Sequence, residues 1–381
     1  MSGFLRRIPL SRLLLLCGVA VSVGIGLTAL AVAVGSGPTP PPKPLAEAVH
    51  DALSAPKVEG VSARIQLTNH LLEGANLASS GGGEASQLSS SPLISGASGR
   101  LWIGSDGRAR LELQSEKGDT QILYDGQNVS MYDASTNTLY RYTPESESAD
   151  EGTRQPCPQG PAGGSCATHG EGDAPPSVAE IEEHLTKASK QAHISGATPT
   201  DVAGQAAYTV RVSPKENGGL IDGAELSWDA AHGSPLRVAV YSTTSTSPVI
   251  ELAATEISYG SVDSSTLDFK PPADAKVQNV TVPKPPTKPG SAGGAKDKPK
   301  VTVHGKGLGA IVLAESPVKA ESKESGASQL EGLQQVDING TKASELPTQL
   351  GTVLSFERAD MLYLLVGSVT PSAIEAFARG L

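Results

Sequence analysis

Histidine, the side chain that most often binds metals or transfers protons near neutral pH, is scattered through this chain without a recognisable pattern. No two of the seven histidines are four residues apart, the spacing that places two ligands on one face of a helix. They are His50, His70, His169, His184, His193, His232 and His304. The sequence therefore predicts no metal site, and solvated or hydrogen-bonded histidines are the simpler interpretation.

Motifs for nucleophilic catalysis and for phosphate binding are also missing from the sequence. No Gly-x-Ser-x-Gly segment is present, so a serine hydrolase of that type is not indicated. The glycine run at 81–83 lacks the Lys-Ser/Thr partner of a phosphate-binding loop. We predict a protein with no catalytic residues and no cofactor, and therefore not an enzyme.

The cysteines favour a structural role. Cys157 and Cys166 lie close together in a loop rich in glycine and proline, which in an oxidising compartment predicts a local disulfide between them. Metal binding there would need more ligands than the nearby His169 supplies. Cys17 follows a leucine, so it is a poor match to a lipoprotein processing site and is interpreted as a small apolar residue.

The N-terminus predicts entry into a membrane. Three arginines precede an uncharged run from Leu13 to Val34, and the next cation is Lys43. The positive-inside rule then places everything after Val34 outside the cytoplasm. The run is long enough to span a bilayer as an anchor, but Ala31, Val32 and Ala33 also offer a cleavage site for a signal peptide. Both alternatives stay open, and both give an extracytoplasmic protein at the plasma membrane or secreted.

Length and charge limit the number of domains and the kinds of partner that we expect. A chain of 381 residues suggests two domains with linkers. The net charge of −10 argues against a nucleic-acid partner and does not favour anionic headgroups as electrostatic partners. The 42 glycines and 28 prolines are typical of generous turns and connections. Contact with a membrane is therefore expected through the N-terminal segment.

Two stretches, 99–142 and 206–259, consist of short alternating strands joined by Asp, Asn and Gly turns, which predicts antiparallel neighbours. Their apolar rows could line a cavity or form an ordinary core. Trp102 and Trp228 could either pack across the sheet or line the cavity. The candidate cavity residues are Ile65, Trp102, Leu111, Leu113, Val210, Val212, Val238 and Val240.

Two helices are expected near these strands. The first begins at Leu45 and ends before Pro56. The second begins with a capping box formed by Ser177 and Glu180. It carries an apolar stripe that we expect to cover the sheet as a lid; the stripe is Val178, Ile181 and Leu185.

The predicted organisation has five parts. Residues 1–34 form the signal peptide or anchor, 35–44 a proline-rich spacer, 45–278 the strand-rich binding domain and 279–300 a linker. Residues 301–381 form a small C-terminal α+β domain of strands followed by a helix. This helix has Thr370 as its N-cap and Pro371 at its first position.

Several segments resemble the periplasmic lipoprotein-carrier (LolA-like) and sigma-factor regulator (RseB/MucB-like) superfamily. They are 99–102 (GRLW), 107–113 (GRARLEL), 124–126 (YDG), 131–133 (MYD), 140–142 (YRY), 226–229 (LSWD), 235–237 (PLR) and 267–272 (LDFKPP). Together they cover about residues 45–280. Segment 366–371 (VGSVTP) is similar to the end of the regulator's second domain.

The resemblance implies an α+β fold in which a curved, half-open antiparallel β-barrel has helices covering its concave face. It also implies an apolar cavity that accepts the acyl chains of a lipid or lipoprotein, in a carrier or a sensor. The alternative function is that of a sigma-factor regulator that binds the extracytoplasmic part of an anti-sigma factor, or another membrane protein.

Overall fold

The computed structural model describes residues 37–73, 92–116, 118–144, 175–216, 218–282, 300–318 and 333–381. The predicted membrane segment and the Cys157–Cys166 pair lie outside these residues. Within them, no helix combines the length and the apolar character needed to cross a bilayer.

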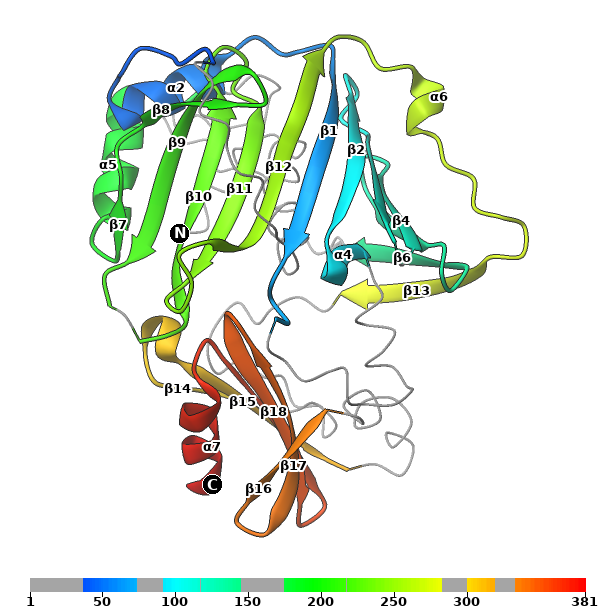
Figure 1. Ribbon diagram of the computed structural model, residues 1–381, viewed down its shortest axis with the longest axis vertical. Coiled ribbons are helices and arrows are strands. Elements are labelled where there is room, and N and C mark those ends of the chain that lie inside the picture. Colours follow the sequence, from blue (N-terminus) through cyan, green and yellow to red (C-terminus); the bar gives the residue numbers. More distant parts are fainter. Residues whose placement is uncertain are drawn as a thin grey trace, which may run out of the picture.

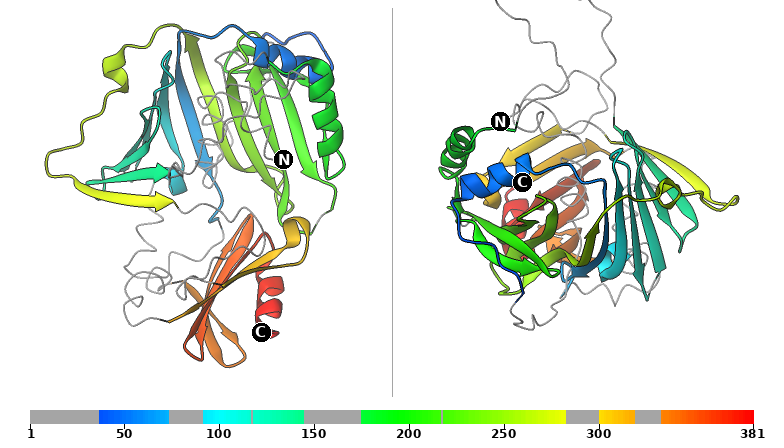
Figure 2. Two further views of the ribbon diagram at one scale, coloured as in Figure 1. Left: turned by 180° about the vertical axis from the view of Figure 1, so that it is seen from behind. Right: turned by 90° about the horizontal axis from the view of Figure 1, so that it is seen from above.

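A thirteen-stranded sheet forms the larger part of the molecule (Figure 1). Its strands are β1 (Gly60–Asn69), β2 (Ala97–Gly104), β3 (Ala109–Ser115), β4 (Gly118–Tyr124), β5 (Val129–Asp133), β6 (Thr138–Pro144), β7 (Ala192–Ile194), β8 (Thr198–Val202), β9 (Gln205–Pro214), β10 (Ile221–Asp229), β11 (Pro235–Ser242), β12 (Pro248–Tyr259) and β13 (Lys276–Val282). They follow the order β13-β6-β5-β4-β3-β2-β1-β12-β11-β10-β9-β7, and β8 also pairs with β9. The sheet curves strongly and does not close into a barrel (Figure 2).

The sheet is mixed, which corrects the expectation of a wholly antiparallel one. β13 runs parallel to β6, whereas the other paired strands of this sheet are antiparallel. A parallel pair needs a long crossover connection, and here the whole second strand run lies between the two strands. β13 also extends into the stretch from residue 279 that the sequence predicted as linker.

The helices of this part lie on and around the sheet. They are α2 (Leu45–Ser54), α4 (Pro92–Ser95), α5 (Val178–Ala188) and α6 (Ser264–Leu267). The predicted capping box of α5 is confirmed: the Ser177 side chain accepts from Glu180 N, and the Glu180 side chain accepts from Ser177 N. Such reciprocal bonds satisfy donors that the first turn of a helix leaves free.

The strand registers define an inner face of the curve. Across β2, β1 and β12 the inner-face residues are aligned in rows, such as Leu101, Ala63 and Ile257. A register shift in β12 skips Thr255, so that Ala254 and Ile257 both belong to this face although they are three residues apart. Thr255 is thus a bulge residue, and the extra position it adds keeps the apolar residues on both sides of it on the inner face of the sheet.

Two separate clusters fill parts of the inner face. At one place Ile65, Leu67 and Leu113 pack together with Leu93 of α4. At the other, Tyr208 and Trp228 pack against α2. The inner face is therefore covered at two places by two different helices.

The C-terminal part is a six-stranded sheet in the order β14-β15-β19-β18-β17-β16. Its strands are β14 (Lys300–His304), β15 (Ile311–Pro317), β16 (Gln334–Ile338), β17 (Thr341–Thr348), β18 (Gly351–Arg358) and β19 (Met361–Gly367), with a 3-10 turn η2 (Gly307–Gly309). Helix α7 (Pro371–Arg379) packs on one face and completes a continuous core. Hydrogen bonds join the two parts, among them Leu220 N to Ser368 O at 2.7 Å and Ser242 Oγ to Gln349 O at 2.7 Å.

Candidate functional site

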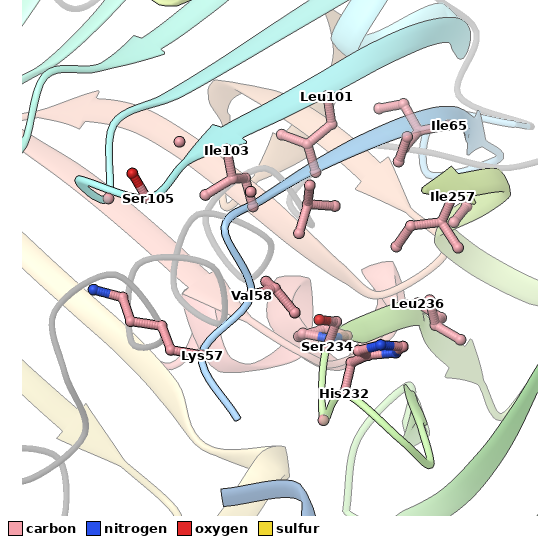
Figure 3. A pocket seen from close by; sticks show the side chains of 18 of the residues that line it. Lys57, Val58, Ile65, Leu101, Ile103, Ser105, His232, Ser234, Leu236 and Ile257 are labelled. Atoms are coloured by element: carbon pink, nitrogen blue, oxygen red, sulfur yellow. The ribbon is translucent and has the colours of Figure 1, made fainter. Parts of the chain in front are cut away.

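A cavity of about 440 Å³ lies on the inner face of the large sheet, at the end nearest α2 (Figure 3). Its size falls within the range of small-molecule sites, about 300–1,000 Å³. β1, β2, β11 and β12 supply an apolar wall. The wall residues are Val61, Ala63, Ile65, Leu101, Ile103, Leu236, Val238, Leu252, Ala254 and Ile257.

The end of α2 and the residues after it cover one side of this cavity. Ala52, Leu53, Pro56, Lys57 and Val58 all line it. α2 ends at Ser54, and Ala55, which precedes Pro56, is already extended, as residues before proline tend to be. The chain then lines the cavity before it enters β1 at Gly60.

This cover lies directly against the turn between β10 and β11. Gly233 has a φ of +64°, and a Cβ at that position would lie 2.1 Å from the carbonyl oxygen of Ala52. Both the backbone conformation and the close approach therefore require glycine. The turn and the cover form one wall of the site.

The rim of the cavity carries polar groups with defined partners. Asp106 forms an ion pair with Arg108, which also reaches Asp268 at 2.9 Å. Hydrogen bonding from Arg108 lowers the pKa of Asp106. Lys57 lies on the same rim and has no hydrogen-bond or ion-pair partner within the part of the chain that the structure describes.

A second polar cluster lies at the β10–β11 turn. Asp229 is buried, and its Oδ1 accepts from the backbone N–H groups of Ala231 and His232 at 2.7 and 2.9 Å. Its Oδ2 accepts from the Tyr259 hydroxyl at 2.7 Å. Burial, reinforced by this hydrogen bond to Asp229, raises the pKa of Tyr259, so the phenol remains a donor.

The His232 side chain belongs to this cluster and also lines the cavity. Its Nδ1 lies 3.2 Å from Asp229 Oδ1, and its ring stacks on Tyr259 with centroids 3.8 Å apart. Among the described residues, no group of three or more His, Cys, Asp and Glu side chains could hold a metal ion. The arrangement can enclose an apolar chain and offer hydrogen bonds at its rim.

The predicted cavity residues divide into three groups. Ile65 and Val238 line the cavity. Leu111, Leu113 and Val210 share the inner face but pack in the two neighbouring clusters.

The remaining candidates lie away from the cavity. Val212 and Val240 are on the inner face by register, and Val212 is exposed. Trp102 pairs with Ser62 and Arg110 in the ladder, which places it on the outer face. Trp228 packs beneath α2.

The predicted lid helix lies beside α2. In α5, Ile181 is buried, and α5 packs against α2, whereas no residue of α5 lines the cavity. His50 of α2 also bonds through Nδ1 to Pro176 O, just before α5, at 2.9 Å. The covering role of α2 was missed by sequence reasoning. The end of this helix before Pro56 was predicted, but no sequence signal indicated that the residues around Pro56 line a cavity.

Comparisons with known proteins give a fold likeness only. No protein-family model matches this sequence, and no curated protein matches it. Among solved structures, the chain is similar to MucB in complex with MucA(peri), with 16% identity, coverage of 88% of this chain and 94% of that chain, and a TM-score of 0.41.

Two further structures show the same kind of similarity. One is the Pseudomonas aeruginosa MucA/MucB complex, with 14% identity, 88% and 96% coverage and a TM-score of 0.41. The other is a LolA superfamily protein from Nitrosomonas europaea, with 7% identity, 85% and 91% coverage and a TM-score of 0.18. At these identities and TM-scores the likeness says nothing about what this chain binds.

Proposed function

We propose that the protein is a non-enzymatic binding protein that holds an acyl chain, of a lipid or of a lipid-modified protein, in the cavity of its large sheet. It would act outside the cytoplasmic membrane, as a carrier or as a sensor of that ligand. The observation that supports this proposal is the apolar cavity between the two packed clusters of the inner face.

The energetics agree with such a role. Burying an acyl chain contributes about 0.8 kcal/mol per methylene, or about 12 kcal/mol for a sixteen-carbon chain before opposing terms. Loss of ligand freedom and displacement of the cover oppose much of this gain. Such binding needs no catalytic group. Shape and apolar surface are sufficient for the function.

Neighbouring residues of β12 provide a matched test. Ala254 lines the cavity, whereas Ala253 faces the other side of the sheet, where it pairs with Gln66 and Arg237. Ala254→Trp should fill the cavity and abolish uptake of a fluorescent sixteen-carbon fatty acid. Ala253→Trp should leave uptake within about twofold of the wild type. Equal uptake by both variants would reject this cavity as the binding site.

A protein-binding regulator is the second candidate, and the C-terminal sheet favours it. Four exposed valines form a patch on the face of this sheet that is opposite α7. Val303 of the edge strand β14, Val312 of β15 and Val366 of β19 are aligned in one row. The patch is Val301, Val303, Val312 and Val366. Exposed apolar patches mark interaction sites, and a free edge strand can pair with an extended segment of another chain.

The partner in this case would be the extracytoplasmic part of an anti-sigma factor, or of another membrane protein. MucB, as its structure describes, forms a complex with MucA(peri). Affinity capture from the native host should recover a single-pass membrane protein, and Val303→Lys should abolish this recovery. Ala254→Trp should not change it. Loss of the partner with Ala254→Trp alone would instead connect partner binding to the cavity.

A further inference from the structure

His232 lines the apolar cavity, and one of its two ring nitrogens has no hydrogen-bond partner among the described residues. Its side chain is 37% exposed, and it lies beside Ser234 and Leu236, across the cavity from Leu101 and Ile103 (Figure 3). Nδ1 is engaged with Asp229. Within the described chain, Nε2 has no hydrogen-bond partner. This nitrogen is therefore available to a ligand.

The tautomer of His232 follows from its partner. An ionised carboxylate can only accept hydrogen bonds, so the hydrogen of a neutral imidazole must be on Nδ1, facing Asp229. Nε2 then carries the lone pair and accepts. Asp229 itself is fixed by two backbone N–H groups and by the Tyr259 hydroxyl. The direction in which His232 offers its acceptor is thus set by a buried group.

The ring is also held in position. It stacks on Tyr259 with an interplanar angle of 25°, and Tyr259 is the last residue of β12. Gly233, the next residue along the chain, lies against the cover at Ala52. The acceptor is therefore preorganised before a ligand arrives, which lowers the entropy that binding must overcome.

We propose that His232 Nε2 is the polar anchor of the cavity and accepts a hydrogen bond from the polar end of the acyl ligand. This inference rests on the proposed binding of an acyl chain. It specifies the ligand as a chain that carries a hydrogen-bond donor next to its apolar part, such as a hydroxyl or an amide N–H. A chain of the same length that ends in an ether or ester lacks the donor and leaves Nε2 unpaired.

Two probes with the same chain test the inference. Hexadecanol carries a terminal hydroxyl, and hexadecyl methyl ether does not. In competition against a fluorescent fatty acid at pH 8, the wild type should bind the alcohol about threefold to tenfold more tightly than the ether, as expected for one hydrogen bond at a partly exposed group. His232→Phe should bind both equally. His193→Phe, which changes an exposed histidine of β7, should keep the preference.

A second measurement uses the unmodified protein and does not depend on the folding of a variant. The ¹⁵N chemical shift of His232 Nε2 should move when hexadecanol binds and should stay in place with the ether. Equal binding of alcohol and ether by the wild type would overturn the anchor and leave acyl binding intact. Failure of the wild type to bind either probe, or the fatty acid, would overturn both proposals.

Discussion

The two sheets of this molecule use the same alternation of apolar residues and reach different results. In the C-terminal sheet, one helix covers one face and the core is continuous; Ile338, Leu354, Leu365 and Ile374 are all 0% exposed. In the large sheet, α2 and α4 cover separate places, and a cavity of about 440 Å³ lies between the clusters they complete.

The difference teaches that an apolar strand face does not by itself define a core. Six strands present a surface that the nine residues of α7 can largely cover. Thirteen curved strands present more surface than the ten residues of α2 and the four of α4 can fill. Because protein interiors pack to the density of organic crystals, unfilled apolar surface of this kind is an opening for a ligand.

The largest expected effect is a contrast between two leucines. Leu365→Ala in the filled core should reduce the free energy of unfolding of the C-terminal sheet by about 2–5 kcal/mol, because it leaves a void that the neighbours cannot close. Leu101→Ala in the cavity wall should cost only about 1–2 kcal/mol, since part of its surface already faces open space.

Native-state hydrogen exchange can follow the two sheets separately, because it reports the opening of each cooperative unit. The amides of β19 should lose protection in the first variant and those of β2 much less in the second. Equal losses would mean that the large sheet is as tightly packed as the small one, and the comparison would fail.

A smaller effect is expected where the cover meets the large sheet. Gly233→Ala should destabilise the protein by about 1–3 kcal/mol and weaken α2's contact with the sheet, because it combines a positive φ with a clash against Ala52. Gly204→Ala provides the control, since Gly204 has a φ of +72° and open space around its Cβ position. Only the first substitution should increase proteolysis in the segment 45–58. The same increase with Gly204→Ala would show that backbone strain alone opens the cover.

Much of the strand pattern could be predicted from the sequence, because turn residues are local signals. The turn at Asp125-Gly126 lies between β4 and β5, as predicted for the stretch 99–142. In the C-terminal domain, for which only strands followed by a helix were predicted, Ala359 and Asp360 separate β18 from β19. Both residues adopt positive φ without a glycine, so the strong Asn-Gly or Asp-Gly signal of a two-residue hairpin is missing there.

The position of the cavity could not be read from alternation. Seven of the eight candidate residues share the inner face, since strand period and register fix the side on which they lie. Trp102 was placed with them, although its neighbours Leu101 and Ile103 are the residues that line the cavity. Which part of a face remains open depends on helix placement, and α2 and α5 have similar apolar stripes.

The smallest expected effect concerns one polar residue inside the filled core. Glu345 on β17 is 2% exposed, and its Oε1 has no hydrogen-bond partner in the described chain. Burial, together with the nearby charge of Glu375, raises its pKa above the usual value for glutamate, while Arg379 opposes the shift. The folded state therefore binds this proton more tightly than the unfolded state does.

Linkage gives the sign of the resulting pH dependence. The contribution of Glu345 to stability is fully present below its unfolded pKa and is lost as pH rises through its raised folded pKa. Glu345→Gln removes this loss and should stabilise the C-terminal sheet at neutral pH by about 1 kcal/mol relative to the wild type, with a smaller difference at pH 4. Urea unfolding across this pH range measures it, with Glu357→Gln on the exposed side of β18 as control. Parallel pH profiles for Glu345→Gln and the wild type would show that water reaches Glu345, and that the small core is less completely filled than its burial indicates.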